Sequence, residues 1–343
     1  MDKVKVYFNS TSHHFSQLLS GLEFLNQEGV IKIEYILDLG TYPGNIFKVN
    51  YKGLNLFFDL EDNSKINSGI YEKADFYIKR MLLKSDLENL DKLIPYGLYY
   101  PVYYRNPFLK YLFLNDFKML KYSLKYWPLL SSILKMKDCI AVNELSSRES
   151  EISKNDQIIF RARLWNPSNN NIEWKQNERR ILNNQRVEIN RLFRDKFDDK
   201  FKGGIMPDAY AEKECPDLLL SKKEYHRRKY LKLIKNSGIG VVNQGLEDSI
   251  GAKFGEYVAH SLAVITTPIN KYQLLGPFTE GEHYLVYHDA EECLEMTRML
   301  FNNNTIREKM QLANKNYYQE YLHPAQKLLK IFEIVQKKNS YLV

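Results

Sequence analysis

Residues 238–268 read GIGVVNQGLEDSIGAKFGEYVAHSLAVITTP. An apolar run at 239–243 leads into a loop with two glycines and then into a helix-length segment, and a second apolar run follows at 263–266. This order is typical of a strand–helix–strand unit, in which the two strands lie parallel in one sheet. The stretch therefore predicts an α/β fold built on parallel strands.

The same alternation extends outward through both halves of the chain. In the first half we expect a helix at 14–27 and strands at 4–8, 33–38, 54–59, 75–78 and 139–142. In the second half we expect strands at 157–160, 239–243, 263–266 and 284–286. The helices expected there lie at 174–196, 222–236, 250–260, 289–301 and 303–320. Short apolar runs separated by amphipathic segments predict a doubly wound sheet in each half.

The length of the chain favours two domains. It has 343 residues, more than a single hydrophobic core usually supports. We expect two Rossmann-like domains, at 1–150 and 151–324, with the polar stretch 143–156 between them, and a final helix at 325–343 that can pack back on the first domain. Two doubly wound domains that face each other bring their strand ends, where such sheets bind ligands, into one central cleft.

Bulk properties narrow the class of protein. No uncharged apolar window reaches the length of about 18 residues that spans a bilayer, and the N-terminus lacks the apolar segment of a signal peptide. Three widely spaced cysteines, Cys139, Cys215 and Cys293, favour a reducing compartment. The histidines show no zinc-binding spacing. We therefore expect a cytoplasmic protein that needs no metal ion or other cofactor.

The loop and helix of the quoted stretch carry residues suited to a phosphate group. Backbone N–H groups are unpaired at a helix N-terminus, so anionic phosphates bind there, beside loop residues such as Gly245 and Ser249. Lys253 can meet a diphosphate as a point charge, and Glu256 can accept hydrogen bonds from ribose hydroxyls. The alternative is structural: Asp248 caps the helix, and Glu256 lies on a solvated face.

In this region the sequence resembles the GT-B glycosyltransferases of group 1 (family 4-like) and, more distantly, exostosin-like enzymes. Asp248 and Glu256 occupy the two acidic positions of their E-x7-E motif, and residues 257–259 and 263–265 match the EYLA-G-PVI pattern that follows it. Residues 276–310 match the pattern at the end of the donor-binding half of these enzymes, which begins G-eGe-ylv. The resemblance implies that Glu256 binds the ribose and that Asp248 faces the donor sugar. At that position the aspartate is one methylene shorter than the commoner glutamate.

Arg161 and Arg163 end the first strand of the second half, in QIIFRARLWN (157–166). The GT-B resemblance, which extends over about 155–325, implies that at least one of them holds the donor diphosphate. Bidentate contacts of this kind stabilise the charge on a departing diphosphate. The alternative is a pair of surface arginines. The arginines of the next helix, 177–197, alternate with acids, and we expect them on a solvated face.

Candidate proton acceptors follow two strands of the first half. His13 and His14 stand at the start of the first helix, and a neutral imidazole can take a proton from a hydroxyl group near pH 7. A role in capping the helix is equally compatible with their position. Asp62 is a rival base, with Asp59 and Glu61 beside it. The sequence leaves open which residue acts and whether the sugar is transferred with inversion or retention.

The stretch 99–137 is basic and rich in aromatic residues. It holds six lysines and one arginine against a single acid, Asp116, so most of the net charge of +7 lies there. Such a segment can lie against anionic lipid, with its aromatic rings at the interface. The alternative is a helical insertion packed inside the first domain. Nucleic acid is not an expected partner, because the rest of the chain is nearly neutral.

Together these features predict a metal-independent glycosyltransferase of the hexosyl type. It would move a sugar from a nucleotide-sugar donor to a glycan or lipid-linked acceptor in cell-surface polysaccharide synthesis. We expect it in the cytoplasm, peripheral to the inner face of the membrane. An NAD-dependent enzyme is disfavoured because no G-x-G-x-x-G follows the first strand. A non-catalytic scaffold that binds carbohydrate or protein is the other alternative, although a scaffold needs no diphosphate clamp.

Overall fold

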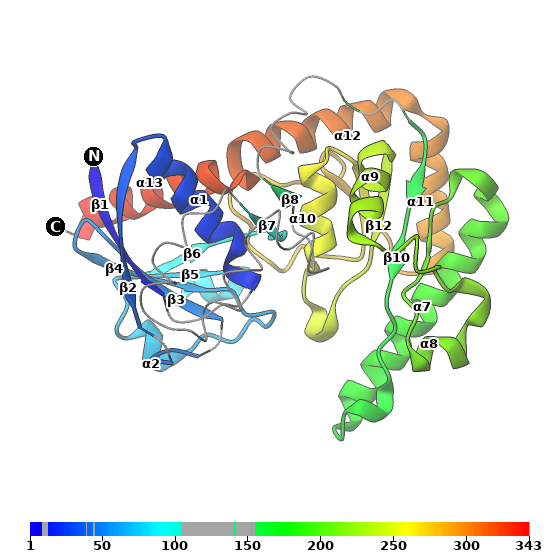
Figure 1. Cartoon of the computed structure of the whole chain (residues 1–343), viewed down its shortest axis with the longest axis horizontal. Coiled ribbons are helices and arrows are strands. Elements are labelled where there is room, and N and C mark those ends of the chain that lie inside the picture. Colours follow the sequence, from blue (N-terminus) through cyan, green and yellow to red (C-terminus); the bar gives the residue numbers. More distant parts are fainter. Residues whose placement is uncertain are drawn as a thin grey trace. The chain divides into compact units, whose positions relative to one another are not determined.

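The computed structural model describes residues 1–8, 13–38, 40–43, 45–103, 140–141, 152 and 155–342. The chain forms two compact units (Figure 1). Unit 1 comprises Met1–Ser150, Asn270–Pro277 and Gln319–Val343, and unit 2 comprises Glu151–Ile269 and Phe278–Tyr318. The segments 270–277 and 319–324, which the sequence-based division placed in the second domain, therefore belong to unit 1. The central cleft between two domains stays a prediction.

A six-stranded sheet forms the centre of unit 1. Its spatial order is β2-β1-β3-β4-β5-β6, and every neighbouring pair is parallel except those that β3 makes with β1 and β4. The strands are β1 (Asp2–Phe8), β2 (Ile31–Leu37), β3 (Ile46–Tyr51), β4 (Leu54–Asp59), β5 (Phe76–Lys79) and β6 (Leu93–Pro95). A separate parallel pair joins β7 (Val102–Tyr103) to β8 (Ile140–Ala141). The five parallel strands of the large sheet place their carboxyl ends at one edge.

Strand β3 is the main departure from the expected parallel sheet. It was not predicted, although β1, β2, β4 and β5 were. It forms a hairpin with β4 through Lys52 and Gly53, both of which have positive φ angles, of 52° and 86°. Two-residue hairpins favour such turns, and Asn-Gly or Asp-Gly is their strong sequence signal. Lys-Gly is a weaker signal, which explains why the hairpin was missed.

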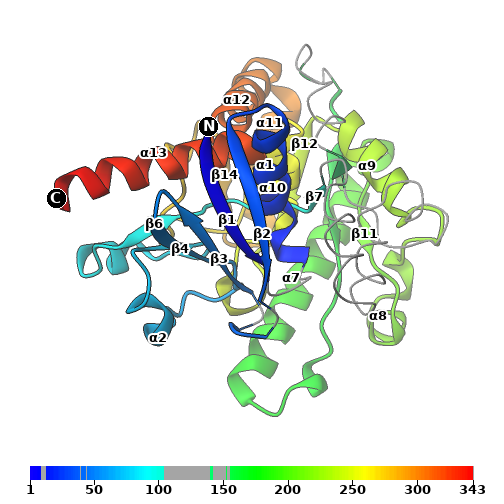
Figure 2. The same cartoon turned by 60° about the vertical axis from the view of Figure 1, so that its left-hand side comes forward.

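Helix α13 (Pro324–Leu342) completes unit 1 by packing against α1 (Ser16–Gln27) (Figures 1 and 2). Gly21 permits the close approach, because a Cβ atom at this position would lie 2.3 Å from the carbonyl oxygen of Pro324. Farther along α13, the ring of Phe332 stacks on Tyr51 of β3, with 4.1 Å between ring centroids. The short helix α2 (Ser68–Tyr71) begins at Asn67, whose side chain accepts a hydrogen bond from the N–H of Ile70.

Unit 2 is built on a parallel sheet with the order β14-β13-β12-β9. These strands are β9 (Ile158–Ile159), β12 (Ile239–Val242), β13 (Ala263–Thr266) and β14 (Tyr284–Val286), as predicted. Just after β9, β10 (Arg161–Ala162) pairs in parallel with β11 (Gly204–Ile205), which was not predicted. The first strand of the unit therefore has β11 on one side and β12 on the other, and the strand order reverses between β10 and β12.

Helices flank this sheet, most of them at the places that the sequence predicted, although α9 begins later than expected and α8 was not predicted. They are α7 (Glu173–Phe197), α8 (Ala209–Glu214), α9 (Arg227–Asn236), α10 (Ala252–Ala259), α11 (Ala290–Asn302) and α12 (Asn304–Tyr317). On α7 the buried positions Leu182, Arg186, Ile189, Phe193 and Phe197 recur every three or four residues, the spacing of one helical face. Burying each large apolar side chain contributes about 1.5–3 kcal/mol to stability.

In the described part of the chain, none of the helices has the length and apolar character needed to cross a membrane. Residues 104–137 of the basic, aromatic stretch lie outside the described residues. Contact of that stretch with an anionic membrane therefore stays a prediction.

Candidate nucleotide-binding site

The carboxyl ends of β10 and β12 meet at the point where the strand order of unit 2 reverses. In doubly wound sheets, ligands bind beyond the strand ends at such a switch point. Arg186 of α7 joins the two ends: it donates hydrogen bonds to the carbonyl oxygen of Arg163 (2.7 Å), the side-chain oxygen of Asn243 (3.0 Å) and the carbonyl oxygen of Gln244 (2.9 Å). All three acceptors are neutral, so none of them neutralises the guanidinium charge.

Arg186 corrects the expectation that the arginines of this helix lie on a solvated face. Its side chain is buried, its guanidinium lies 3.8 Å from the centroid of the Trp165 ring, and burial lowers its pKa to about 9. Arg180, Arg191 and Arg194 are exposed, as expected. A signal was present in the sequence, because position 186 falls within the apolar stripe of the helix.

Two further cations, both predicted, meet beside Arg186. Arg161 is buried; it donates to the carbonyl oxygen of Glu224 (2.6 Å), and its guanidinium lies 5.9 Å from the ring centroid of Tyr230. Lys253, in the first turn of α10, is half-buried and donates a hydrogen bond to the carbonyl oxygen of Arg161. The structure therefore places these two residues, 92 positions apart in sequence, in direct contact.

The electrostatic surroundings of Lys253 are strongly positive. Burial lowers the pKa of its ammonium group to about 7, the charges of Arg186, Arg163 and Arg161 act in the same direction, and Glu256 opposes them. Arg163 itself is exposed at the end of β10. The charges of three arginines and one carboxylate thus act on Lys253 at the switch point. An excess of positive charge of this kind favours a multiply charged anion.

Glu256 lies in α10 with only 2% of its surface exposed, so the alternative of a solvated face is wrong. Its carboxylate forms an ion pair with Arg227, at the start of α9, and accepts a hydrogen bond from the hydroxyl of Tyr230 (3.3 Å). Neither partner was predicted. A carboxylate has about four acceptor positions, so these two contacts leave room for others. The role of Glu256 as a ribose ligand stays a prediction.

The loop that contains Gly245, Asp248 and Ser249 has an unusual backbone. Glu247 and Asp248 adopt left-handed φ angles of 57° and 56° in succession. The N–H of Gly245 donates to the carbonyl oxygen of Ser249 (2.7 Å), and the side chain of Gln244 donates to Asp248 Oδ1 (3.1 Å). Asp248 does not cap α10, which begins after Gly251 without a side-chain hydrogen bond. The capping alternative is therefore wrong.

In unit 1, the predicted bases lie beyond the carboxyl ends of the parallel strands. His13 and His14 form a short 3-10 turn (His13–Phe15) before α1, and the ring of His14 stacks on Tyr99 with 5.6 Å between centroids. Arg80 lies 5.1 Å from the centroid of the same Tyr99 ring and forms an ion pair with Asp62. Tyr99 therefore contacts both His14 and the Arg80–Asp62 pair.

The surroundings of Asp59, considered as a rival base, indicate a role in stabilising the sheet of unit 1. It is buried in unit 1, where it accepts hydrogen bonds from the ammonium group of Lys79 (2.9 Å) and the hydroxyl of Tyr77 (2.5 Å). Both partners lie on β5, the strand beside β4. This buried pair ties the ends of two neighbouring strands together, and an acceptor hydroxyl group cannot reach it.

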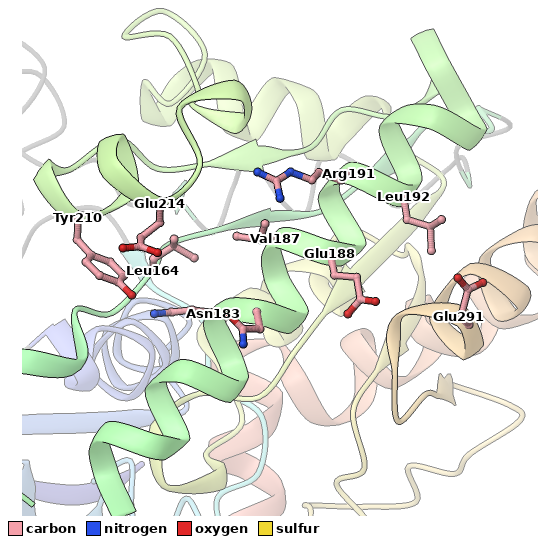
Figure 3. A pocket seen from close by; sticks show the side chains of 10 residues that line it. Leu164, Asn183, Val187, Glu188, Arg191, Leu192, Tyr210, Glu214 and Glu291 are labelled. Atoms are coloured by element: carbon pink, nitrogen blue, oxygen red, sulfur yellow. The ribbon is translucent and has the colours of Figure 1, made fainter. Parts of the chain in front are cut away.

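A hollow of about 540 Å³ opens in unit 2 between α7, α8 and α11 (Figure 3). Side chains of α7 such as Asn183, Val187 and Arg191 line it, with Tyr210 of α8 on one side and Glu291 of α11 on the other. None of the predicted site residues contributes to it. Among the residues that the structure describes, no three His, Cys, Asp or Glu side chains are grouped as metal ligands would be.

No protein-family model and no curated protein matches the sequence. Among solved structures, the chain is similar to an α-glucosyltransferase (AGT) in complex with UDP, with 10% identity over 98% of this chain and 100% of that one and a TM-score of 0.42. It is similar to a glycosyltransferase from Rickettsia africae, with 12% identity over 92% and 87% and a TM-score of 0.34. It is also similar to the pneumococcal O-GlcNAc transferase GtfA in complex with UDP and GlcNAc, with 10% identity over 88% and 66% and a TM-score of 0.35. All three of these structural neighbours are glycosyltransferases, at identities and TM-scores from which no activity follows for this chain.

Proposed function

We propose that the protein is a glycosyltransferase that moves a sugar from a nucleoside diphosphate sugar to a hydroxyl group of a glycan or lipid-linked acceptor. The observation that carries this proposal is the cluster of Arg161, Arg163, Arg186 and Lys253 at the switch point of the unit 2 sheet. Charge grows on the diphosphate as the sugar leaves, and pre-positioned cations stabilise that charge.

Each residue of the cluster has a distinct part in this proposal. Arg161, Arg163 and Lys253 bind the diphosphate, while Arg186 adds positive charge beside Lys253 and keeps the ends of β10 and β12 together. Glu256 accepts hydrogen bonds from the ribose hydroxyls with the acceptor positions that Arg227 and Tyr230 leave open. Asp248 faces the donor sugar, as the resemblance to GT-B enzymes implies.

For the base, the proposal favours the histidines over Asp62. The charge of Asp62 is paired with Arg80, whereas an imidazole near the carboxyl end of β1 can take a proton near neutral pH. Replacing His13 or His14 by alanine should therefore reduce turnover more than Asp62→Asn does. A larger loss in Asp62→Asn than in both histidine variants would assign the base to Asp62.

Two finer parts of the proposal rest on the sequence. We propose that no metal ion is needed, because arginine and lysine can carry the diphosphate charge; loss of activity in EDTA that Mg²⁺ or Mn²⁺ restores would contradict this. The composition of 99–137 favours an acceptor at an anionic membrane surface. Vesicles of anionic lipid should bind the protein and release it as salt rises.

The donor site can be tested with Glu256→Gln and Lys253→Ala. Loss of one hydrogen bond to a charged group costs about 1.5–3 kcal/mol, or roughly 10- to 150-fold in transfer rate at limiting donor. Lys309→Ala is the matched control, because Lys309 is exposed on α12. The donor for the assay is chosen by thermal shift with UDP-, GDP-, dTDP- and CMP-sugars, since a ligand at 100 times its Kd adds about 2.7 kcal/mol of stability.

Circular dichroism should show that both variants keep the fold. If donor affinity and turnover are unchanged in Glu256→Gln and in Lys253→Ala, the assignment of the donor site is wrong.

A further inference from the structure

Residues 243–249, here called the donor loop, form most of the connection between β12 and α10 and have a backbone conformation that their sequence disfavours. Glu247 and Asp248 both have φ angles near 57°, in the left-handed region that residues with a Cβ atom avoid. Aspartate tolerates this region better than glutamate, which has no short-range hydrogen bond to offset the strain. Glu247 must therefore be held in place by its surroundings.

Helix α7 supplies contacts that hold Glu247. The ammonium group of Lys175 pairs with Glu247 Oε1 at 2.6 Å, and the backbone N–H of Glu247 donates to the carboxylate of Glu178, also at 2.6 Å. The Lys175–Glu247 pair is partly exposed and is weak on its own in water. The bond from a backbone N–H to a carboxylate is the stronger contact, because the acceptor is charged.

The same helix holds the other end of the donor loop. Arg186 donates to Asn243 and Gln244, where the loop leaves β12. Lys175, Glu178 and Arg186 are separated by three and eight residues, so they fall along one side of α7. A single rigid element therefore holds the loop at its first residues and at its left-handed turn, with Gly245 between the two points of contact.

We propose that Lys175 and Glu178 are positioning residues for the donor. They keep Glu247 and Asp248 left-handed and thereby direct the Asp248 carboxylate and the backbone of residues 245–249 toward the sugar and diphosphate. This inference rests on the proposed function, and it adds residues that touch no substrate. Aspartate at position 248 is compatible with the left-handed turn, because aspartate tolerates this region better than most residues with a Cβ atom.

The test compares Glu178→Ala with Glu178→Gln in the full chain. The alanine variant should bind UDP or GDP, whichever binds the wild type, about tenfold more weakly, the factor for one lost charge-assisted hydrogen bond. Glutamine keeps an acceptor for the N–H of Glu247 and should stay within about threefold of the wild type. Glu188→Ala, an exposed acid on the same helix, is the matched control and should bind as the wild type does.

A rescue experiment separates positioning from a general structural role. Glycine adopts left-handed angles without strain, so Glu247→Gly removes the need for the contacts that Lys175 and Glu178 make with residue 247. The double variant Glu178→Ala, Glu247→Gly should bind the nucleotide within about threefold of Glu247→Gly alone. Thermal melting monitors the fold of every variant. Equal affinity of Glu178→Ala and the wild type, or failure of Glu247→Gly to rescue in a folded protein, would overturn the inference.

Amide hydrogen exchange tests the positioning role of α7 separately from the proposed glycosyltransferase function. In Glu178→Ala without any ligand, exchange at residues 247–249 should rise above that of the wild type, because the N–H of Glu247 loses its acceptor. Unchanged exchange there refutes the positioning role whatever the ligand. Raised exchange in a protein that binds none of the nucleoside diphosphates supports the role of α7 and refutes the proposed function instead.

Discussion

At the scale of single residues, Lys253 links the candidate site to pH. Its pKa of about 7 means that only part of the unliganded protein carries a charged Lys253 at neutral pH. Arg161, Arg163 and Arg186 disfavour the proton, and Glu256 favours it. A diphosphate beside the ammonium group adds negative charge and raises that pKa, so binding should take up a proton.

We therefore predict that affinity for a nucleoside diphosphate falls on the order of tenfold between pH 6.5 and pH 8.5, as Lys253 loses its proton. Calorimetry at pH 8 in buffers of different ionisation enthalpy should show proton uptake, at a pH where the phosphates are already ionised. Lys253→Arg keeps its charge and should remove most of this dependence. A wild type with the same affinity at both pH values would contradict the pKa assigned to Lys253.

At the scale of elements, α7 has two roles, whereas its amphipathic sequence indicated only packing on the sheet. It packs its apolar stripe on the sheet and also carries Arg186 to the switch point, where the guanidinium satisfies acceptors of three residues from two strand ends. A lysine has a compact ammonium group and cannot reproduce the planar fork that serves several acceptors at once.

Removing this guanidinium should destabilise unit 2. We predict that Arg186→Met lowers the free energy of unfolding by about 3 kcal/mol, because it leaves three acceptors unpaired, of which that of Asn243 is buried. Arg186→Lys should lower it by less. Arg180→Met is the control, since Arg180 is exposed on the same helix and should change stability within about 0.5 kcal/mol. Urea unfolding measures all three; an Arg186→Met variant as stable as the control would show that the bridge contributes nothing.

At the scale of the whole molecule, unit 1 is assembled from distant parts of the chain. Its sheet comes from the first hundred residues, and its last helix, α13, comes from the end. The side chain of Gln17 in α1 donates to the carbonyl oxygen of Leu322 (3.0 Å), just before α13 begins. The cation cluster, in contrast, lies wholly within unit 2.

We predict that Gly21→Ala destabilises unit 1 by about 1–3 kcal/mol, because the added methyl group meets the backbone of Pro324. Gly69→Ala, in α2, is the matched control: its nearest neighbour would be 3.8 Å away, and alanine there should add up to about 1 kcal/mol. Calorimetry should show that Gly21→Ala lowers the stability of the protein, while the variant still binds the nucleotide. Greater stability in both variants would contradict the α1–α13 contact.

The sequence by itself determined the α/β class, most strands and helices of unit 2, and the loop and helix that carry Lys253 and Glu256. These features arise from apolar periodicity and from glycines within a few residues of each other, so a local pattern is enough to predict them. The same reasoning missed β3 and β11, whose places depend on pairing with other strands more than on their own short sequences.

Only the tertiary structure decided how the site is put together. Arg227 lies 29 residues from its partner Glu256 and Asn243 lies 57 residues from its partner Arg186, and α13 reaches α1 from the other end of the chain. Whether a charged side chain on a helix is solvated or buried depends on what packs against that helix, and periodicity describes only the helix itself. Arg186, which was expected on the surface, is therefore buried within the cation cluster, because its guanidinium finds three acceptors at the ends of two strands.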